Sequence, residues 1–308
     1  MTVVLVYNPV SGRGRAEAAA RALADELARA EIATRIVASR REEPAEWLRP
    51  ELPDASAVVV AGGDGAVRLV SREAARASLP LWQLPLGTEN LFARAFGMSG
   101  EAVAIVAALR AGRAREIDVG LAAFAGAGGA AAAEQHFAIM ASVGFDAEVV
   151  HALGRTRAGR IRHASYIAPL LESLGSWKPA ELAWEIDGEV ESLGRGIVIV
   201  GNLPEYGVRL NPTSSAVPDD RALDAVFIPA SSPLAALAWM PLLRAGLHAR
   251  HPEVRFRRGA RIGLFASGPV RLQLDGDPAG DGAGHRELAF RIAPERLRVL
   301  LPADPPAR

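Results

Sequence analysis

The chain has 308 residues, 50% of them hydrophobic and 23% charged, and its formal net charge is zero. This composition supports a large buried core, and the length predicts about two domains. The absence of cysteine excludes disulfides, thiolate nucleophiles and zinc–thiolate sites. The neutral charge balance gives no general basic field of the kind that binds nucleic acid, so we expect no nucleic-acid partner.

The sequence also carries no strong membrane or secretion signal. No apolar stretch approaches the roughly 20 residues of a transmembrane helix, so we expect no transmembrane segment. Met1-Thr2-Val3 leads directly into a strand-like segment without a charged leader, which argues against secretion. We therefore expect a cytoplasmic protein.

Three strand-loop-helix units begin the chain. In the first, a strand-like run over 3–7 precedes a loop at 8–15 and a helical run over 16–30; in the third, a run over 81–84 precedes the segment 85–94. The strands end in Gly, Asn, Thr or Ser residues, which offer small size or polar donors to phosphate oxygens. Because loops after parallel strands lie on one edge of the sheet, we expect the three loops to be neighbours.

The second unit carries the strongest signal. Its apolar run, Val58-Val59-Val60-Ala61, leads into Gly62-Gly63-Asp64-Gly65-Ala66 and then a helix. A helix start has unpaired N–H groups and the positive end of the helix dipole, and glycines let the main chain approach an anion. The pattern predicts a phosphate-binding loop.

The sequence changes character near its middle. Residues 1 to about 115 alternate apolar and helical segments, which predicts an α/β domain with a parallel sheet. The Gly/Ala tract over 122–133 predicts a flexible hairpin tip, and a mainly β region is expected beyond it. The expected strands are 181–186, 189–193, 196–200, 223–228, 271–274 and 286–292, with a turn at Asp187-Gly188, a strand at 297–301 that returns to the first domain, and helices at 160–174 and 234–247.

Four motifs follow one another along the chain. They are NPVSG at 8–12, GGDGA at 62–66, PLGTENLFAR at 85–94 and LDGD at 274–277. In this order they resemble the catalytic domain shared by diacylglycerol kinases, sphingosine and ceramide kinases and bacterial soluble lipid kinases, within the NAD kinase-like superfamily. The resemblance spans nearly the whole chain.

The resemblance implies a fold of two domains. Residues 1–118 would form a nucleotide-binding α/β domain with a parallel sheet, to which 294–308 return. Residues 119–293 would form a mainly β sandwich domain for the lipid substrate, with the active site in the cleft between the domains.

Other phosphoryl-transfer architectures do not fit. Lys178, in Trp-Lys-Pro, is the only lysine, so the lysine of a P-loop and the strand lysine of protein kinases are both absent. No G-x-G-x-x-G fingerprint follows the N-terminal strands, which argues against a dinucleotide-binding dehydrogenase. NAD kinase shares G-G-D-G, but the later G-T-x-N-x-x-A-R pattern favours the lipid kinases.

The resemblance assigns the catalytic roles. It implies an ATP- and Mg²⁺-dependent lipid kinase in which Asp275 is the general base for a lipid hydroxyl, Asp64 lies beside the metal and phosphates, and Asp277 stands in the last motif. Simpler interpretations remain open, because Asp275-Gly276 suits an ordinary hairpin turn and Asp64 can cap the helix that starts near Gly65.

The resemblance also implies the binding residues. Those expected to hold the nucleotide are Asn8, Pro9, Ser11, Gly12, Gly62, Gly63, Gly65, Ala66, Arg68, Gly87, Thr88 and Asn90. Asp118 matches a position linked through water to the catalytic magnesium. Asp219 and Asp220 match a D-D-G-x-L-D loop in which some bacterial members hold a structural magnesium. A turn aspartate and a solvated acidic loop are the plainer alternatives.

Several positions depart from the family pattern. Ala66 replaces a phosphate-contacting threonine, Arg68 an asparagine, Leu91 an aspartate and Asp277 a glutamate. A catalytically weak or inactive kinase-like protein that binds nucleotide or phospholipid as a regulator therefore stays open, as does a kinase for a soluble hydroxylated molecule. The acceptor, diacylglycerol-like or sphingoid, and the purine of the nucleotide are also open.

A lipid substrate requires contact with a membrane, which we expect to be peripheral, at the inner membrane surface. Arginine clusters at 155–162 and 255–261 are candidates for headgroup contact, against the alternative of solvated faces. The apolar run 234–247 is a candidate cover for an acyl-chain cleft, against the alternative of a core helix. The oligomeric state is open, with a homodimer as one option.

Overall fold

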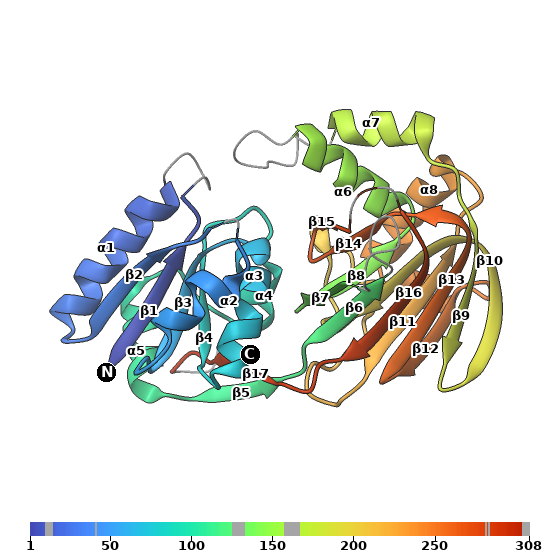
Figure 1. Cartoon of the computed structure of the whole chain (residues 1–308). Coiled ribbons are helices and arrows are strands. Elements are labelled where there is room, and N and C mark those ends of the chain that lie inside the picture. The colour runs from blue at the N-terminus through green and yellow to red at the C-terminus, as the bar shows by residue number, and fades with distance from the viewer. Residues whose placement is uncertain are drawn as a thin grey trace. The chain divides into compact units, whose positions relative to one another are not determined.

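The chain divides into two compact units. The computed structural model describes residues 1–9, 15–40, 42–124, 133–156, 167–280, 282 and 284–303. Within these residues, unit 1 comprises 1–117 and the segment from Pro294 onward, and unit 2 comprises the part of the chain from Asp118 to Ala293. Figure 1 shows the helices and strands of each unit.

Unit 1 is built around a six-stranded sheet in the order β2-β1-β3-β4-β17-β5. All neighbouring strands in it are parallel except β17 and β5, which are antiparallel. The strands are β1 (Thr2–Tyr7), β2 (Ala33–Ala38), β3 (Ala57–Gly62), β4 (Leu81–Pro85), β5 (Ala114–Ile117) and β17 (Leu297–Leu300). The helices are α1 (Arg15–Arg29), α2 (Pro44–Trp47), α3 (Asp64–Arg76), α4 (Leu91–Ala95) and α5 (Ala102–Ala111), with a 3-10 turn, η2, at Arg49–Glu51.

The sequence of unit 1 explains this arrangement. All six residues of β3 are buried, as expected for a strand covered on both faces of a parallel sheet. Helix α1 buries Ala16, Ala20, Leu23 and Leu27, which recur at helical spacing, and turns charged side chains outward. The predicted α/β domain with a parallel sheet is confirmed.

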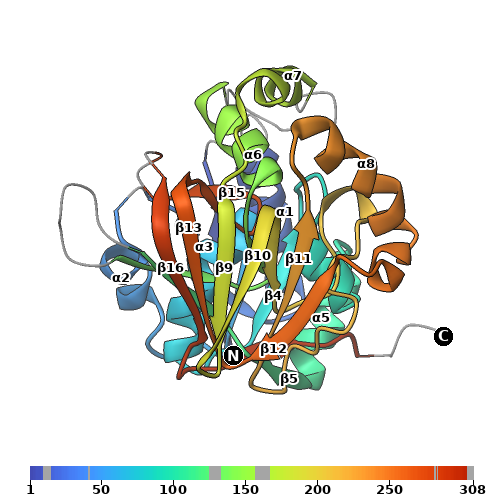
Figure 2. The same ribbon diagram turned by 90° about the vertical axis from the view of Figure 1, so that its right-hand side faces the viewer.

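Unit 2 is antiparallel and mainly β, and its strands form two layers that share β10. The strands are β6 (Gly120–Phe124), β7 (Ala133–Phe137), β8 (Met140–Val143), β9 (Glu181–Ile186), β10 (Glu189–Gly201), β11 (Leu223–Pro229), β12 (Arg255–Gly259), β13 (Arg261–Val270), β14 (Leu272–Leu274), β15 (Asp277–Ala279) and β16 (His285–Ile292). The helices are α6 (Phe145–Thr156), α7 (Ile167–Ser176) and α8 (Pro233–Arg244), with 3-10 turns η5 (Gly207–Arg209) and η6 (Leu247–Arg250). Figure 2 shows α6, α7 and α8 at the margins of the strands.

Strand β10 connects the two layers. Its first part, 189–195, pairs with β9, and its second part, 196–201, pairs with β8 and β11. A bulge between Ser192 and Gly194, where Gly194 has φ 85°, marks the change of register. Apolar side chains from both layers, among them Trp184 and Val198, form one buried cluster between them. The predicted β-sandwich is confirmed.

The expected elements of unit 2 are found with some changes. Strand 181–186 and the turn at Asp187-Gly188 agree with the prediction, whereas the expected strands 189–193 and 196–200 are one continuous strand. The expected helix 234–247 is α8 followed by η6. Helix α6 and strands β6, β7, β8, β12, β13 and β15 had no counterpart among the expected elements. The expected helix 160–174 is α7 from Ile167 onward, and its earlier part lies outside the described residues, as does most of the Gly/Ala tract.

Gly120 provides a test of the packing in unit 2. It lies opposite Phe137 in the β6–β7 pair, and a Cβ atom at residue 120 would lie 2.1 Å from Cζ of the Phe137 ring. That ring is fully buried and makes an edge contact with Phe290, at 6.4 Å between centroids, so it has little room to move.

We expect Gly120→Ala to destabilise unit 2 by about 1–3 kcal/mol, because overpacking displaces a buried ring. Gly175→Ala is the matched control, since a Cβ atom at that helical glycine meets no atom within 4 Å. Thermal unfolding of both variants tests the prediction. Equal transition midpoints for G120A and wild type would contradict it.

Candidate active site

The three predicted loops of unit 1 follow neighbouring strands. β1, β3 and β4 are adjacent and parallel, with Tyr7 opposite Ala61 and Gly62 opposite Pro85. The loops that leave these strands therefore lie on one edge of the sheet, which confirms the prediction. In the first loop Asn8 is half-buried and Pro9 is exposed, whereas Ser11 and Gly12 lie outside the described residues.

The second and third loops touch through their main chains. A Cβ atom on Gly87 would lie 2.7 Å from Cα of Gly63, a distance that no side chain tolerates. Leu86 N–H also donates to the carbonyl of Gly62, at 3.1 Å. Gly87 is therefore required by the close approach of two main chains, and a Cβ atom on Gly63 would be tight, at 3.1 Å from Gly87 Cα.

Asp64 joins the same two loops. It is the first residue of α3, and its carboxylate accepts hydrogen bonds from the N–H groups of Leu91 (3.1 Å) and Phe92 (3.0 Å), at the start of α4. The alternative that Asp64 caps its own helix is wrong, because α3 has Gly63 as its N-cap and no side-chain cap. Burial raises the pKa of Asp64, against the effect of the two N–H donors.

A buried glutamine and an asparagine complete this network. Gln83 is fully buried in β4; its side-chain amide donates to the Gly62 carbonyl (3.1 Å) and its Oε1 accepts from Ala93 N–H (2.8 Å). Asn90, with φ 50°, accepts from Gly87 N–H at 2.8 Å and donates back to its carbonyl at 3.2 Å. Gln83 was not among the predicted site residues, and its signal in the sequence is one polar residue inside an apolar strand.

The remaining predicted nucleotide residues lie at the same two loops. Gly65, Ala66 and Arg68 are in the first turns of α3 and are half-buried, as is Thr88 in the third loop. Ala66 packs against Gly62, since a Cβ atom on that glycine would lie 2.6 Å from the Ala66 methyl group.

In unit 2, Asp275 and Gly276 form the two-residue turn of the β14–β15 hairpin. Leu274 pairs with Asp277, and the turn residues have φ 51° and 85°, both in the left-handed region. The turn Asp187-Gly188 has nearly the same backbone, with φ 53° and 85°. The hairpin interpretation of Asp275-Gly276 is therefore correct. The Asp187-Gly188 turn serves as a comparison, because it has nearly the same backbone geometry.

The side chain of Asp275 differs from that of Asp187. Asp187 is exposed, whereas Asp275 is buried and its carboxylate accepts three main-chain N–H groups. The donors are Ala138 (2.7 Å), Ile139 (2.9 Å) and Met140 (2.9 Å). These three hydrogen bonds fix the orientation of the carboxylate. The turn itself does not need them, as the Asp187 turn shows.

A second buried glutamine supports this turn. Gln273, fully buried in β14, accepts from Gly276 N–H at 2.8 Å and donates to Ser142 Oγ at 2.8 Å. Asp277, the last predicted catalytic residue, begins β15 and is half-buried. The catalytic roles of Asp64, Asp275 and Asp277 stay predictions, with Asp64 in unit 1 and the other two in unit 2.

Asp118 is bound by an arginine. Its carboxylate is fully buried and accepts the main-chain N–H (2.6 Å) and a guanidinium N–H (3.2 Å) of Arg221. Arg221 occupies the glycine position of the family's D-D-G-x-L-D pattern and has the left-handed φ of 63° that glycine would adopt there. Its guanidinium also donates to the Ala293 carbonyl, at 3.3 Å.

The rest of this loop is also neutralised by arginine. Asp220 forms an ion pair with Arg258 and accepts Ala222 N–H at 3.1 Å, and Asp219 precedes it in the same loop. Burial raises the pKa of the nearby Asp224, against a hydrogen bond from Ser215 and the charge of Arg258. Three aspartates, Asp118, Asp220 and Asp224, are therefore paired with two guanidinium groups.

These contacts do not suit a structural magnesium ion, which needs carboxylates free to face it. Within the described ranges, no group of three or more acidic or histidine side chains is placed to hold a metal. The magnesium roles of Asp118, Asp219 and Asp220 stay predictions from the resemblance, and the arginine contacts argue against them.

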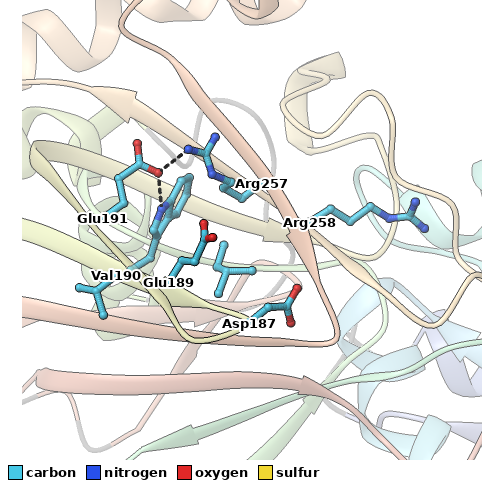
Figure 3. A pocket seen from close by; sticks show the side chains of 8 residues that line it. Asp187, Glu189, Val190, Glu191, Arg257 and Arg258 are labelled. Carbon is cyan, nitrogen blue, oxygen red and sulfur yellow. Dashed lines mark hydrogen bonds and ion pairs between the residues drawn. The ribbon is translucent and has the colours of Figure 1, made fainter.

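A cavity of unit 2 is lined by residues other than these aspartates. It measures about 390 Å³, and Figure 3 shows its lining. In this cavity the Glu191 carboxylate accepts a hydrogen bond from the Trp184 indole N–H (3.0 Å) and forms an ion pair with Arg257 (2.8 Å). That carboxylate is therefore already paired. The cavity contains none of the predicted site residues. Its lining residues are Trp184, Ile186, Asp187, Glu189, Val190, Glu191, Arg257 and Arg258.

Arg221 provides a test of the arginine-bound loop. Arg221→Gly keeps the left-handed backbone but removes the guanidinium from a buried carboxylate, so we expect a loss of about 1.5–3 kcal/mol in the stability of unit 2. Arg209→Gly is the matched control, because Arg209 is exposed, has φ 58° and has no carboxylate partner among the described residues. We also expect EDTA to leave the wild-type melting temperature unchanged. A lower melting temperature on chelation would show that a cation holds the loop.

Comparison with known families agrees with this geometry. Residues 2–122 match the diacylglycerol kinase catalytic domain, and residues 139–301 match the YegS C-terminal NAD kinase beta sandwich-like domain. The chain is 32% identical over 259 residues to a Pseudomonas fluorescens protein named "Probable lipid kinase YegS-like", covering 81% of this chain and 78% of that protein. It is 29% identical over 306 residues to a diacylglycerol kinase of Mycobacterium tuberculosis, covering 97% and 95%.

Solved structures show the same fold. A diacylglycerol kinase from Bacillus anthracis str. Sterne superposes with a TM-score of 0.67 at 16% identity, over 97% of this chain and 96% of that one. Yeast NADH kinase superposes with a TM-score of 0.54 at 13% identity, over 98% and 83%. With both domains matched in order and relatives aligned over most of its length, the chain belongs to the diacylglycerol kinase catalytic-domain family of phosphotransferases.

Proposed function

We propose that this protein is an ATP-dependent lipid kinase that transfers the γ-phosphoryl group to a hydroxyl of a lipid acceptor, diacylglycerol-like or sphingoid. The observation that carries the proposal is the buried Asp275 carboxylate, held by three main-chain N–H groups in a turn that does not require them. Family membership and the names of the relatives support the same reaction.

In this proposal unit 1 binds the nucleotide as its Mg²⁺ complex, and Mg²⁺ neutralises charge on the phosphates when bound. The residues that would bind it are those of the three loops, with Asn8, Gly62, Gly63, Gly65, Thr88 and Asn90 as the central set. Asp64 orders the loops by bonding to Leu91 and Phe92 N–H, so that main-chain donors near it are held in place.

In unit 2, Asp275 acts as the general base. The lipid hydroxyl oxygen forms a bond to the γ-phosphorus as the bond to the departing ADP oxygen breaks, and the hydroxyl proton passes to the Asp275 carboxylate. The fixed orientation of that carboxylate lowers the cost of arranging the base for transfer. Asp277 adds negative charge beside it.

A catalytically weak or inactive kinase-like regulator is the second candidate. It is favoured by the side chain at residue 91, where a buried leucine at the start of α4 stands in place of the family's aspartate. That change removes a carboxylate from the loop edge, and assay of turnover separates the two candidates.

No described helix is long and apolar enough to cross a bilayer. We propose that the protein works in the cytoplasm and reaches its lipid at the inner membrane surface.

The first test replaces the base. We expect Asp275→Asn to lower lipid phosphorylation by about 10²–10⁴-fold, the usual contribution of general base catalysis, while nucleotide binding is kept. Asp187→Asn is the matched control, because it makes the same change in a turn of the same backbone geometry and should leave activity unchanged.

Turnover, nucleotide affinity and melting temperature are measured for both variants. Because Asp275 also binds three N–H groups, some loss of stability is expected in D275N, and activity is compared well below its melting temperature. Wild-type amounts of phosphorylated lipid from folded D275N would remove Asp275 from the proposed role.

The second test identifies the acceptor. The protein is incubated with γ-labelled ATP, magnesium and vesicles that carry diacylglycerol, ceramide, a sphingoid base or phosphatidylglycerol, with GTP as the alternative donor. We expect label in one of these lipids. Binding of ATP without label in any lipid would favour the regulator.

A further inference from the structure

Helix α8 turns apolar side chains toward solvent. Leu234 is 72% exposed and Met240 is 36% exposed, and Ala238 and Pro241 are exposed beside them. At about 100° per residue Leu234, Ala238 and Pro241 lie on one side of the helix, and Met240 lies at the margin between this side and the buried one. The helix carries no charge before Arg244. A surface helix ordinarily places polar side chains there, as α1 does.

This exposure is not the result of a loosely attached helix. The opposite face buries Ala236, Trp239 and Leu243, and the Trp239 indole donates to the Pro229 carbonyl at 2.7 Å. Ser232 caps the N-terminus by accepting Ala235 N–H, at 3.2 Å. In Figure 2, α8 lies at the side of unit 2 beside β11.

The apolar surface continues past the helix. Val208 and Leu247 are each 46% exposed, in η5 and η6. Arg244 donates to the Val208 carbonyl at 3.1 Å, and η6 follows α8 directly and packs on it. We call Val208, Leu234, Ala238, Met240, Pro241 and Leu247 the α8 patch.

The charged side chains in the segments that carry the α8 patch have one sign. Arg209, Arg244 and Arg250 are exposed, and none of them has a carboxylate partner within the described part of the chain. The segments that carry the patch contain no acidic residue from 206 to 218 or from 225 to 252.

The arginine clusters singled out in the sequence differ in this respect. Arg255 and Arg257 pair with Glu191, and Arg258 pairs with Asp220 and Asp224. Arg155 pairs with Glu172, and residues 157–162 lie outside the described residues. In contrast to these paired arginines, Arg209, Arg244 and Arg250 beside the α8 patch can meet an external anion.

We propose that the α8 patch docks the protein on a bilayer surface that contains anionic lipid. The inference rests on the proposed lipid-kinase function, because a membrane-embedded acceptor requires such a contact. Leu234, Met240 and Leu247 would enter the boundary between headgroups and acyl chains, and the arginines would bind lipid phosphates. The surface is interfacial, since α8 has 12 residues and a spanning helix needs about 20.

Vesicle sedimentation without nucleotide tests the proposal. We expect wild type to bind phosphatidylcholine vesicles that contain phosphatidylglycerol more tightly than pure phosphatidylcholine, with affinity falling as salt is raised. Leu234→Glu/Met240→Glu should weaken binding about tenfold or more. Arg250→Gln should weaken it about fivefold on the anionic vesicles only.

Val103→Glu is the matched control. Val103 is 82% exposed on α5 of unit 1, so the variant replaces an exposed apolar side chain by a glutamate on another helix and should bind vesicles as wild type does. Unchanged binding by L234E/M240E, or equal loss in V103E, would overturn the proposal.

Two further measurements distinguish the remaining outcomes. Phosphorylation of a short-chain diacylglycerol below its micellar concentration should be unchanged in L234E/M240E. If wild type phosphorylates this acceptor but does not bind vesicles, the docking surface is rejected and the kinase function is kept. The oligomeric state should be the same in wild type and L234E/M240E. A wild-type dimer that this variant converts to a monomer would assign the patch to a second copy of the chain and overturn the proposal.

Discussion

Hydrogen bonds from main-chain N–H groups to aspartate carboxylates hold the candidate site together in both units. In unit 1, Asp64 accepts two such bonds from the start of α4, which ties the second loop to the third. In unit 2, Asp275 accepts three from residues 138–140, which ties the β14–β15 turn to the chain before β8. Buried main-chain N–H donors need acceptors. The carboxylates of these two aspartates are the acceptors, and each adds a negative charge at a fixed position.

A buried glutamine stands two residues before each of these loops. Gln83 precedes Pro85 in β4, and Gln273 precedes Asp275 in β14. Gln83 accepts Ala93 N–H from the segment that follows β4, and Gln273 accepts Gly276 N–H from the turn that follows β14, so each strand is tied to the segment after it. Both units thus contain a buried strand glutamine that bonds to the main chain of the segment after it.

Much of the fold could be predicted from local patterns. The apolar runs of β1, β3 and β4 and the Asp187-Gly188 turn are encoded in adjacent residues, and the structure agrees with them. The partners of Asp64 and Asp275 could not be predicted, because they lie 27 to 28 and 135 to 137 residues away. Arg221 shows the same limit, because its role depends on Asp118, 103 residues away. Helix α6 was missed because the β pattern of its neighbours dominated the assignment.

The strand common to both layers of unit 2 has a mechanical consequence. One end of β10 belongs to each layer. Neither layer can therefore separate without breaking hydrogen bonds in the other. We therefore expect unit 2 to unfold as a single cooperative unit rather than layer by layer. We expect a substitution that disrupts one end of β10 to affect the other end as well. The turn that carries Asp275 is connected to β10 through β8.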